Sequence, residues 1–265
     1  MILRCFLALA CVLALGVCIS NPILFPFFLF LIVGLYLGIT ALGIFILFIM
    51  SLFCYGKKPF EKDNAFLRFF AYLTMGGILE FFGITPVGKG LEKMPKEPCV
   101  IVCNHLSRFD PMVSFVLMPG RKLAFISKME NMRIPIAGPI IQKIGFLPLD
   151  RDNPLKAMRT IHKGAKLVSG QGFTMGIYPE GTRGDGEKLL NFKPGAFVMA
   201  KKAACPLVVC SISGSLDYKK RIPFRRSKAV FSVLEVLDQE TVKEKKPEEL
   251  AEISFGIIEK ELYTK

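Results

Sequence analysis

The first fifth of the chain is almost entirely apolar, and charged residues become frequent only after it. No Asp, Glu, Lys or Arg occurs from Cys5 through Gly56. A helix that crosses a membrane needs about 20 apolar residues, so a stretch of this length suits two crossings joined by a turn. Ser20–Pro22 carries the turn signal, and the pattern therefore predicts two membrane-spanning helices, near 3–19 and 27–50.

Positive residues at both ends of this apolar stretch predict its orientation. Arg4 lies at the N-terminal end of the first span, and Lys57 and Lys58 follow the second. Under the positive-inside rule both ends lie in the cytoplasm, so residues 1–56 are predicted to form an uncleaved transmembrane hairpin anchor. We expect the hairpin to lie in the inner (cytoplasmic) membrane of the cell, with the rest of the chain on the cytoplasmic side.

A cleaved signal peptide is the alternative for the same N-terminus. Arg4 and the apolar run to Val17 fit such a peptide. Val17, however, is bulkier than the small residue that a cleavage site requires, and a second, longer apolar segment follows it. These two observations favour the hairpin.

Residues 57–86 are less apolar than the predicted anchor and more apolar than the remaining chain. Phe and Leu dominate Asn64–Gly83, and Arg68 and Glu80 are its only charged residues. This stretch is too polar for a confident membrane span and too apolar for a helix surrounded by water. It predicts an interfacial helical segment over 57–86, with an ordinary core helix as the alternative.

From residue 87 to residue 265, apolar runs of strand length alternate with helical patterns. After a turn-rich stretch at 87–95, strands are predicted at 98–103, 122–127, 145–149, 173–178, 206–211 and 229–236. Helices are predicted at 135–144, 153–169, 194–204 and 246–263, the second of them with Asn153 as N-cap and Gly170 past its end. Such alternation indicates an α/β domain over 87–265, with a mostly parallel sheet flanked by helices.

The net charge indicates the kind of partner that the chain binds, and the cysteine spacing bears on metal sites and disulfides. The chain has 35 Lys and Arg against 22 Asp and Glu, a net charge of +13 that implies an anionic partner. Membrane phospholipid, nucleic acid and an acidic substrate or carrier all satisfy this, and beside a membrane anchor the lipid is favoured. The eight cysteines include no Cys-x-x-Cys pair, so neither a zinc site nor a disulfide framework is indicated.

The stretch Asn104–Asp110 carries the first candidate chemistry. His105 leaves the end of a predicted strand, and Asp110 stands before Pro111, where the next helix begins. A carboxylate folded back onto the imidazole would fix its tautomer and stabilise its cation, as a general base requires. A structural histidine beside a helix-capping aspartate is the alternative that this spacing alone leaves open.

A second candidate cluster, Tyr178–Gly184, follows another predicted strand. Its glycines allow a ligand to approach the backbone closely, and Thr182 adds a hydroxyl group. Arg183 offers a planar guanidinium that suits phosphate. A solvated turn is the alternative for this string taken alone.

Taken together, the two clusters resemble motifs of the glycerolipid acyltransferases, specifically the bacterial 1-acyl-sn-glycerol-3-phosphate acyltransferases. Four blocks match the family in order, at 104–110, 145–151, 178–183 and 205–210, and Phe192–Ala196 matches the link between the last two. The resemblance covers roughly residues 87–215. Two positions depart from the family pattern: Tyr178 stands where Phe is more common, and Val209 where a second proline is common.

The resemblance implies the transfer of a fatty acyl group from acyl-CoA or acyl carrier protein to the sn-2 hydroxyl of lysophosphatidic acid. The resemblance also implies that residues 87–265 are an acyltransferase domain, which forms phosphatidic acid without a metal or another cofactor. His105 would be the catalytic base, aided by Asp110. The substrate-binding residues that it implies are Asn104, Lys128, Arg151, Glu180, Gly181, Thr182 and Arg183.

Two other functions compete with this one. The acceptor could be another lyso-lipid, such as a lyso-aminolipid, or the chain could be a non-catalytic membrane protein that binds anionic lipid. The second of these gives no reason for His105 and Asp110. Cys103 as a nucleophile is disfavoured because it lies in a buried run, and His162, in the middle of a helix, is expected to be structural.

Overall fold

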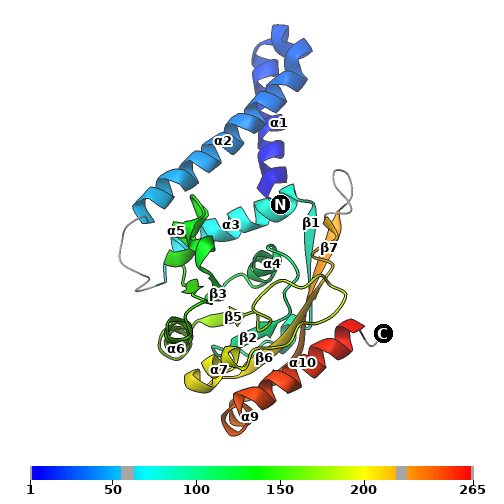
Figure 1. Cartoon of the computed structure of the whole chain (residues 1–265). Helices are drawn as coiled ribbons and strands as arrows, with labels where there is room; N and C mark the ends of the chain where they lie inside the picture. Colours follow the sequence, from blue (N-terminus) through cyan, green and yellow to red (C-terminus); the bar gives the residue numbers. More distant parts are fainter. Residues whose placement is uncertain (1, 55–62, 219–225, 264–265) are drawn as a thin grey trace.

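The computed structural model describes residues 2–54, 63–218 and 226–263, and a helical hairpin projects from a layered domain (Figure 1). Helix α1 spans Ile2–Ser20, a 3-10 turn spans Pro22–Phe27, and α2 spans Phe28–Cys54. Both helices are long and apolar enough to cross a membrane, as predicted for 3–19 and 27–50. Large apolar side chains such as Phe30 and Ile19 are more than 70% exposed on the hairpin, as a surface that faces lipid requires.

A seven-stranded sheet forms the centre of the domain, in the order β1-β7-β6-β2-β5-β3-β4. Only the β6–β7 pair is antiparallel, so the sheet is mostly parallel, as predicted. Every residue of β2 is buried, because helices cover both faces of the sheet. The strands are β1 (Ile84–Lys89), β2 (Val100–Cys103), β3 (Leu123–Lys128), β4 (Leu147–Leu149), β5 (Thr174–Ile177), β6 (Leu207–Ser213) and β7 (Ser227–Leu237).

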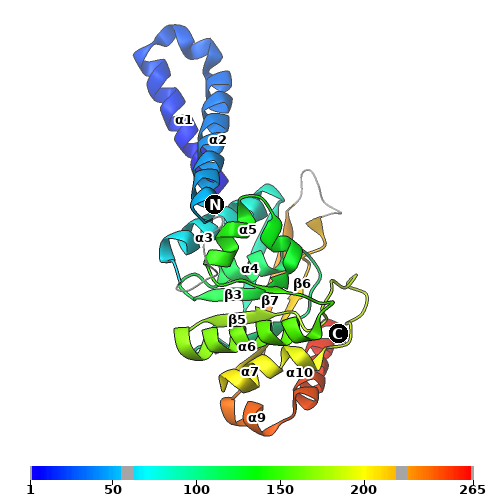
Figure 2. The ribbon, with the colours of Figure 1, turned by 60° about the vertical axis from the view of Figure 1, so that its left-hand side comes forward.

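Two layers of helices enclose this sheet (Figure 2). The layer on the side of the hairpin contains α3 (Ala65–Phe81), α4 (Asp110–Leu117) and α5 (Ala137–Lys143). The opposite layer contains α6 (Pro154–Gln171), α7 (Val198–Ala203), α9 (Gln239–Glu244) and α10 (Pro247–Tyr263). Short 3-10 turns also occur at Leu91–Lys93, Met129–Arg133 and Pro194–Ala196.

Helix α3 shows whether residues 64–83, predicted as an interfacial or a core helix, pack into the domain. Asn64 caps it by accepting a hydrogen bond from Leu67 N at 3.0 Å. One face packs into the core through Leu67, Ala71, Met75 and Leu79, whereas Phe66, Phe69 and Phe81 are exposed on the other. The helix is therefore part of the domain core and also presents aromatic side chains outward. Residues 57–62 of the predicted interfacial segment lie outside the described residues.

A largely buried arginine, Arg68, with 11% of its side chain exposed, connects α3 to the rest of the domain. Arg68 pairs with Asp63 at 2.6 Å and donates to Leu123 O at 2.6 Å and Ile144 O at 2.8 Å. The guanidinium also lies 5.5 Å from the ring centroid of Phe173. Its charge is thus paired and its donors are used, which allows an arginine to lie in the interior.

Three local predictions were wrong. Strand β1 begins at Ile84, so the stretch predicted as a turn at 87–95 starts inside a strand that pairs with β7. Helix α6 begins as predicted, with Asn153 capping Lys156 N at 3.0 Å, but it continues to Gln171. Gly172, at φ 72°, ends it in place of Gly170 because glycine adopts this left-handed conformation without strain. Helix α9 was not predicted.

Candidate active site

The predicted site residues follow neighbouring strands of the sheet. Strands β2, β5, β3 and β4 are adjacent and parallel, so their carboxyl ends lie at one edge. His105 follows β2, Glu180–Arg183 follow β5, Lys128 ends β3 and Arg151 follows β4. Ligand sites of open α/β sheets form at this edge, outside the carboxyl ends of the strands.

His105 and Asp110 are in direct contact. His105 Nδ1 lies 2.8 Å from Asp110 Oδ2, and the carboxylate side chain is completely buried. Leu106 N and Ser107 N donate to the same oxygen at 2.7 and 2.8 Å. The Asp110 carboxylate thus points back to the loop before it, and no side-chain hydrogen bond caps its own helix, contrary to the predicted N-cap role.

This contact fixes what the imidazole of His105 can do. An ionised carboxylate only accepts hydrogen bonds, so Nδ1 of His105 carries the proton and Nε2 has a free lone pair. The His105 side chain is 16% exposed, which leaves it accessible to a ligand at the sheet edge. A histidine in this tautomer, held by a buried carboxylate, is suited to take a proton from a hydroxyl group.

The ring of Tyr178 packs against the imidazole of His105, a contact that the sequence did not suggest. Its ring stacks on that of His105 with centroids 4.1 Å apart and planes 16° apart, and Phe125 stacks behind it at 5.6 Å. Ser114 in α4 lies near the Tyr178 hydroxyl, and the Ser114 hydroxyl donates to Asp110 O at 3.1 Å. Burial raises the pKa of Tyr178 well above its usual value, so the hydroxyl stays protonated.

Glu180 links the two candidate loops. Its Oε1 accepts from His105 N at 2.6 Å, and its Oε2 accepts from Leu190 N at 3.2 Å. Gly184 N donates to His105 O at 2.8 Å and gives the loops a second link. Burial raises the pKa of Glu180, whereas the two amide hydrogen bonds oppose that rise. The Glu180 side chain therefore uses both oxygens to hold backbone near His105.

Asn104 is buried and bridges two strands. Its Nδ2 donates to Ile212 O at 2.9 Å, and its Oδ1 accepts from Ile212 N at 2.7 Å. The side chain thereby continues the hydrogen bonding between β2 and β6 past the end of β2. It fixes the backbone from which His105 projects.

The cations of the site are exposed. Lys128 pairs with Glu130 at 2.8 Å, and Arg151, Thr182 and Arg183 lie at the surface of the same edge. Among the contacts between residues that the structure describes, none joins Lys128 or Arg151 to His105. These side chains therefore share an edge with the histidine and are available to a ligand.

Lys193 is a further cation at this loop that sequence reasoning passed over. Gly181 adopts φ 72°, and a Cβ added there would meet Lys193 Nζ at 2.9 Å. Lys193 N also donates to Pro179 O at 2.9 Å, which anchors Lys193 beside the loop. Lys193 could have been found from the sequence, because it lies in the Phe192–Ala196 block that matches the family. A glycine at 181 thus leaves space for a lysine beside Arg183.

The two alternative reactive residues lie elsewhere or are unreactive. Cys103 is buried, and burial raises the pKa of its thiol well above the usual value, which disfavours the nucleophilic thiolate. His162 lies in α6, on the face of the sheet opposite α4. Cys103 contributes to the site through its contact with Asn104 Oδ1, at 3.7 Å.

Known proteins are similar to the part of the chain that carries this site. Residues 87–213 match the family model described as Acyltransferase. A 1-acyl-sn-glycerol-3-phosphate acyltransferase of Haemophilus influenzae is 26% identical over 208 residues, which are 75% of this chain and 85% of the relative. A chloroplastic protein of the same name from Brassica napus is 35% identical over 129 residues, which are 48% of this chain.

The chain covers only part of the length of some of these relatives, and one solved structure shares its fold. The chain covers 37% of the length of the Brassica protein and 51% of the human 1-acyl-sn-glycerol-3-phosphate acyltransferase beta, which is 34% identical over 143 residues. The crystal structure of PlsC, the 1-acyl-sn-glycerophosphate acyltransferase from Thermotoga maritima, aligns with a TM-score of 0.59. That alignment covers 93% of this chain and 96% of PlsC at 23% identity, and it supports the fold.

Proposed function

We propose that this chain, whose residues 87–213 match the Acyltransferase family model, acylates lysophosphatidic acid. A fatty acyl group would pass from an acyl thioester, acyl-CoA or acyl carrier protein, to the sn-2 hydroxyl, giving phosphatidic acid for phospholipid synthesis. The names of the Haemophilus, Brassica and human relatives support this acceptor. Another lyso-lipid, such as a lyso-aminolipid, is the alternative acceptor.

The observation that carries this proposal is the 2.8 Å contact between His105 Nδ1 and the buried Asp110 carboxylate at the end of β2. Nε2 of His105 takes the proton of the acceptor hydroxyl as its oxygen attacks the thioester carbonyl carbon. Asp110 stabilises the imidazolium that forms. When the tetrahedral intermediate collapses, the carbon–sulfur bond breaks and the imidazolium returns the proton to the leaving thiolate. An ester and a free thiol result.

Substrate recognition is assigned to the exposed cations of the same edge. Arg183 meets the phosphate of the acceptor, with Lys128 and Arg151 in support, because a guanidinium can bind two phosphate oxygens at once. Asn104 and Glu180, first expected to bind substrate, support this site indirectly, since their polar atoms bind backbone groups. Gly181 and Thr182 complete the loop that the acceptor approaches.

Tyr178 gives a prediction that separates the effect of the stacked ring from that of the hydroxyl group. Tyr178→Leu removes the ring under His105, and we expect kcat to fall roughly 2- to 12-fold, since an aromatic pair contributes about 0.5–1.5 kcal/mol. Tyr178→Phe keeps the ring and should retain kcat within about twofold. Steady-state kinetics of both variants across pH provide the measurement. Equal losses in the two variants would show that the hydroxyl matters and the stack does not.

The hairpin supports a membrane location, and its orientation remains a proposal. Arg4 at one end and the lysines at the other favour both ends in the cytoplasm, with the acyltransferase domain at the inner membrane. We therefore expect a reporter fused after Lys265 to be active when it needs the cytoplasm and inactive when it needs export. A fusion that works only after export, or a mature chain that starts near Ile19, contradicts the hairpin anchor.

A purified-protein assay tests the enzyme against a non-catalytic lipid-binding protein. The full chain in detergent is given acyl-CoA or acyl carrier protein thioester, with and without lysophosphatidic acid, and release of free thiol is followed. The proposal predicts thiol release that depends on the acceptor. Saturable lipid binding with no thiol release above background would favour the non-catalytic alternative.

A further inference from the structure

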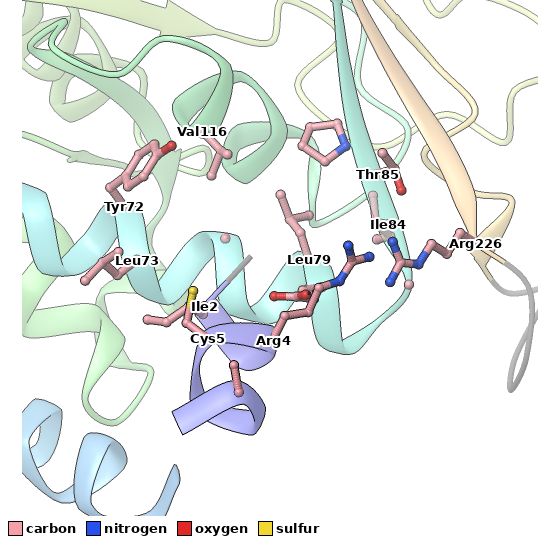
Figure 3. Close-up of a pocket in the computed structure, with 15 residues that line it drawn as sticks. Ile2, Arg4, Cys5, Tyr72, Leu73, Leu79, Ile84, Thr85, Val116 and Arg226 are labelled. Carbon is pink, nitrogen blue, oxygen red and sulfur yellow. Dashed lines mark ion pairs between the residues drawn. The ribbon is translucent and has the colours of Figure 1, made fainter. Parts of the chain in front are cut away.

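A cavity of about 530 Å³ lies where the hairpin meets the domain (Figure 3). Its walls come from the first turns of α1, from α3, from the start of β1 and from α4. The lining is mostly apolar and includes Ile2, Leu73, Leu79, Ile84 and Val116. A volume of this size is typical of sites for small amphiphilic ligands.

Charged side chains gather at one end of this cavity. Arg4, Glu80 and Arg226 all line it, and Figure 3 shows the guanidinium groups of Arg4 and Arg226 at the same end. Arg4 Nε lies 3.0 Å from Glu80 Oε1, and Leu3 N donates to Glu80 Oε2 at 3.1 Å. The charged residues that line the cavity in the described part of the chain are thus two arginines and one glutamate.

Two adjacent glycines of α3 shape the contact with α1. A Cβ added at Gly77 would lie 2.9 Å from Cγ2 of Ile2, so Gly77 permits the close approach of α1. Gly76 lines the cavity, and a Cβ added there would meet nothing within 4 Å. The cavity therefore adjoins a tightly packed contact and does not result from loose docking of the hairpin.

An aromatic cluster lies between this cavity and the catalytic loop. Phe82, next to the cavity residue Gly83, has its ring centroid 4.9 Å from that of Phe109, the neighbour of Asp110. Tyr218 contacts both rings, at 6.1 and 5.0 Å. The cavity is thus adjacent to the active site but has its own apolar walls and its own cations.

We propose that this cavity binds one anionic membrane phospholipid in addition to the reacting lipids. Its phosphate would lie between Arg4 and Arg226, and one acyl chain would follow the apolar walls toward α4. Such a lipid is available there because the base of a membrane hairpin lies at the depth of the headgroups, where anionic lipid attracts arginine. The inference rests on the proposed membrane anchoring of the hairpin and is independent of acyl transfer.

Native mass spectrometry of the full chain in non-ionic detergent tests the charge part of this inference. Phosphatidylglycerol and phosphatidylcholine with identical acyl chains are offered at equal concentration. The wild type should retain phosphatidylglycerol preferentially, and Arg226→Gln should reduce that preference by about tenfold or more, because a charge-assisted hydrogen bond is lost. Lys228→Gln, which removes an exposed cation two residues further on, is the matched control and should leave it unchanged. A wild type that does not distinguish the lipids overturns the proposal.

A second pair of variants tests whether the lipid lies in the cavity. Gly76→Leu fills the cavity and should abolish the preferential adduct, whereas Gly256→Leu, at an open helix position on α10, should retain it. Arg183→Ala should also retain it, because the acceptor site is separate. An adduct that survives Gly76→Leu, or one that disappears with Arg183→Ala, contradicts the proposed site. Neither outcome bears on whether the chain transfers acyl groups.

Discussion

His105→Ala is expected to lower kcat by about 10²- to 10⁴-fold, the usual contribution of a general base. The imidazole is the group that we propose takes the hydroxyl proton, and its Nδ1 lies 2.8 Å from the Asp110 carboxylate. Acceptor binding should change little, because the phosphate is assigned to Arg183 on the neighbouring loop. Turnover and acceptor binding, the latter measured by equilibrium titration, are therefore compared in the same variant.

His162→Ala is the matched control for this prediction, because the chain has two histidines and this one lies in α6. It should keep kcat near the wild-type value. Asp110→Asn should lower kcat as well, since it removes the charge that stabilises the imidazolium. If His105→Ala retains turnover within about threefold of wild type, another base operates and the assignment is wrong.

Arg183→Ala is expected to lower kcat/KM for lysophosphatidic acid by roughly 10- to 150-fold. A hydrogen bond to a charged group contributes about 1.5–3 kcal/mol, and about 1.4 kcal/mol is tenfold. Arg183 is exposed on the loop that follows β5, and Gly181 and Gly184 on either side leave that loop accessible. The KM of the thioester should move little, because the phosphate belongs to the acceptor.

Two comparisons make this second prediction specific. Arg183→Lys should recover only part of the loss, since an ammonium keeps the charge but cannot bind two oxygens at once. The kcat/KM for a phosphate-free acceptor should change little in Arg183→Ala. Arg159→Ala, an exposed arginine on α6, controls for the loss of one positive charge. Equal losses with both acceptors would mean that Arg183 is structural or serves the donor.

The fold and the contact between His105 and Asp110 could be predicted because their signals are local. Strand β2 is a continuous buried run, and the loop after it brings His105 and Asp110 together within six residues. Helix α6 carries its own N-cap, Asn153. The loops after β2 and β5 each follow a recognisable apolar run, so the candidate chemistry could be assigned to strand ends.

The remaining features depend on partners that are distant in the sequence. Asn104 was expected to bind substrate, but the amide pairs with Ile212, which lies 108 residues further on. Glu180 reaches back 75 residues to His105 N. The stack of Tyr178 on His105 likewise requires the order of strands in the sheet, which no local pattern reveals. Strand β1 was missed because Pro86 and Gly88 within it read as a turn.

The measurement that tests the central claim most directly is a mass-spectrometric product analysis with competing acceptors. The purified chain receives an isotope-labelled acyl thioester together with equal amounts of lysophosphatidic acid and a lyso-aminolipid. The account predicts that the label appears in phosphatidic acid, at the sn-2 position, and that His105→Ala abolishes it. Label that appears chiefly in the acylated aminolipid, or in neither product, would contradict the proposed function.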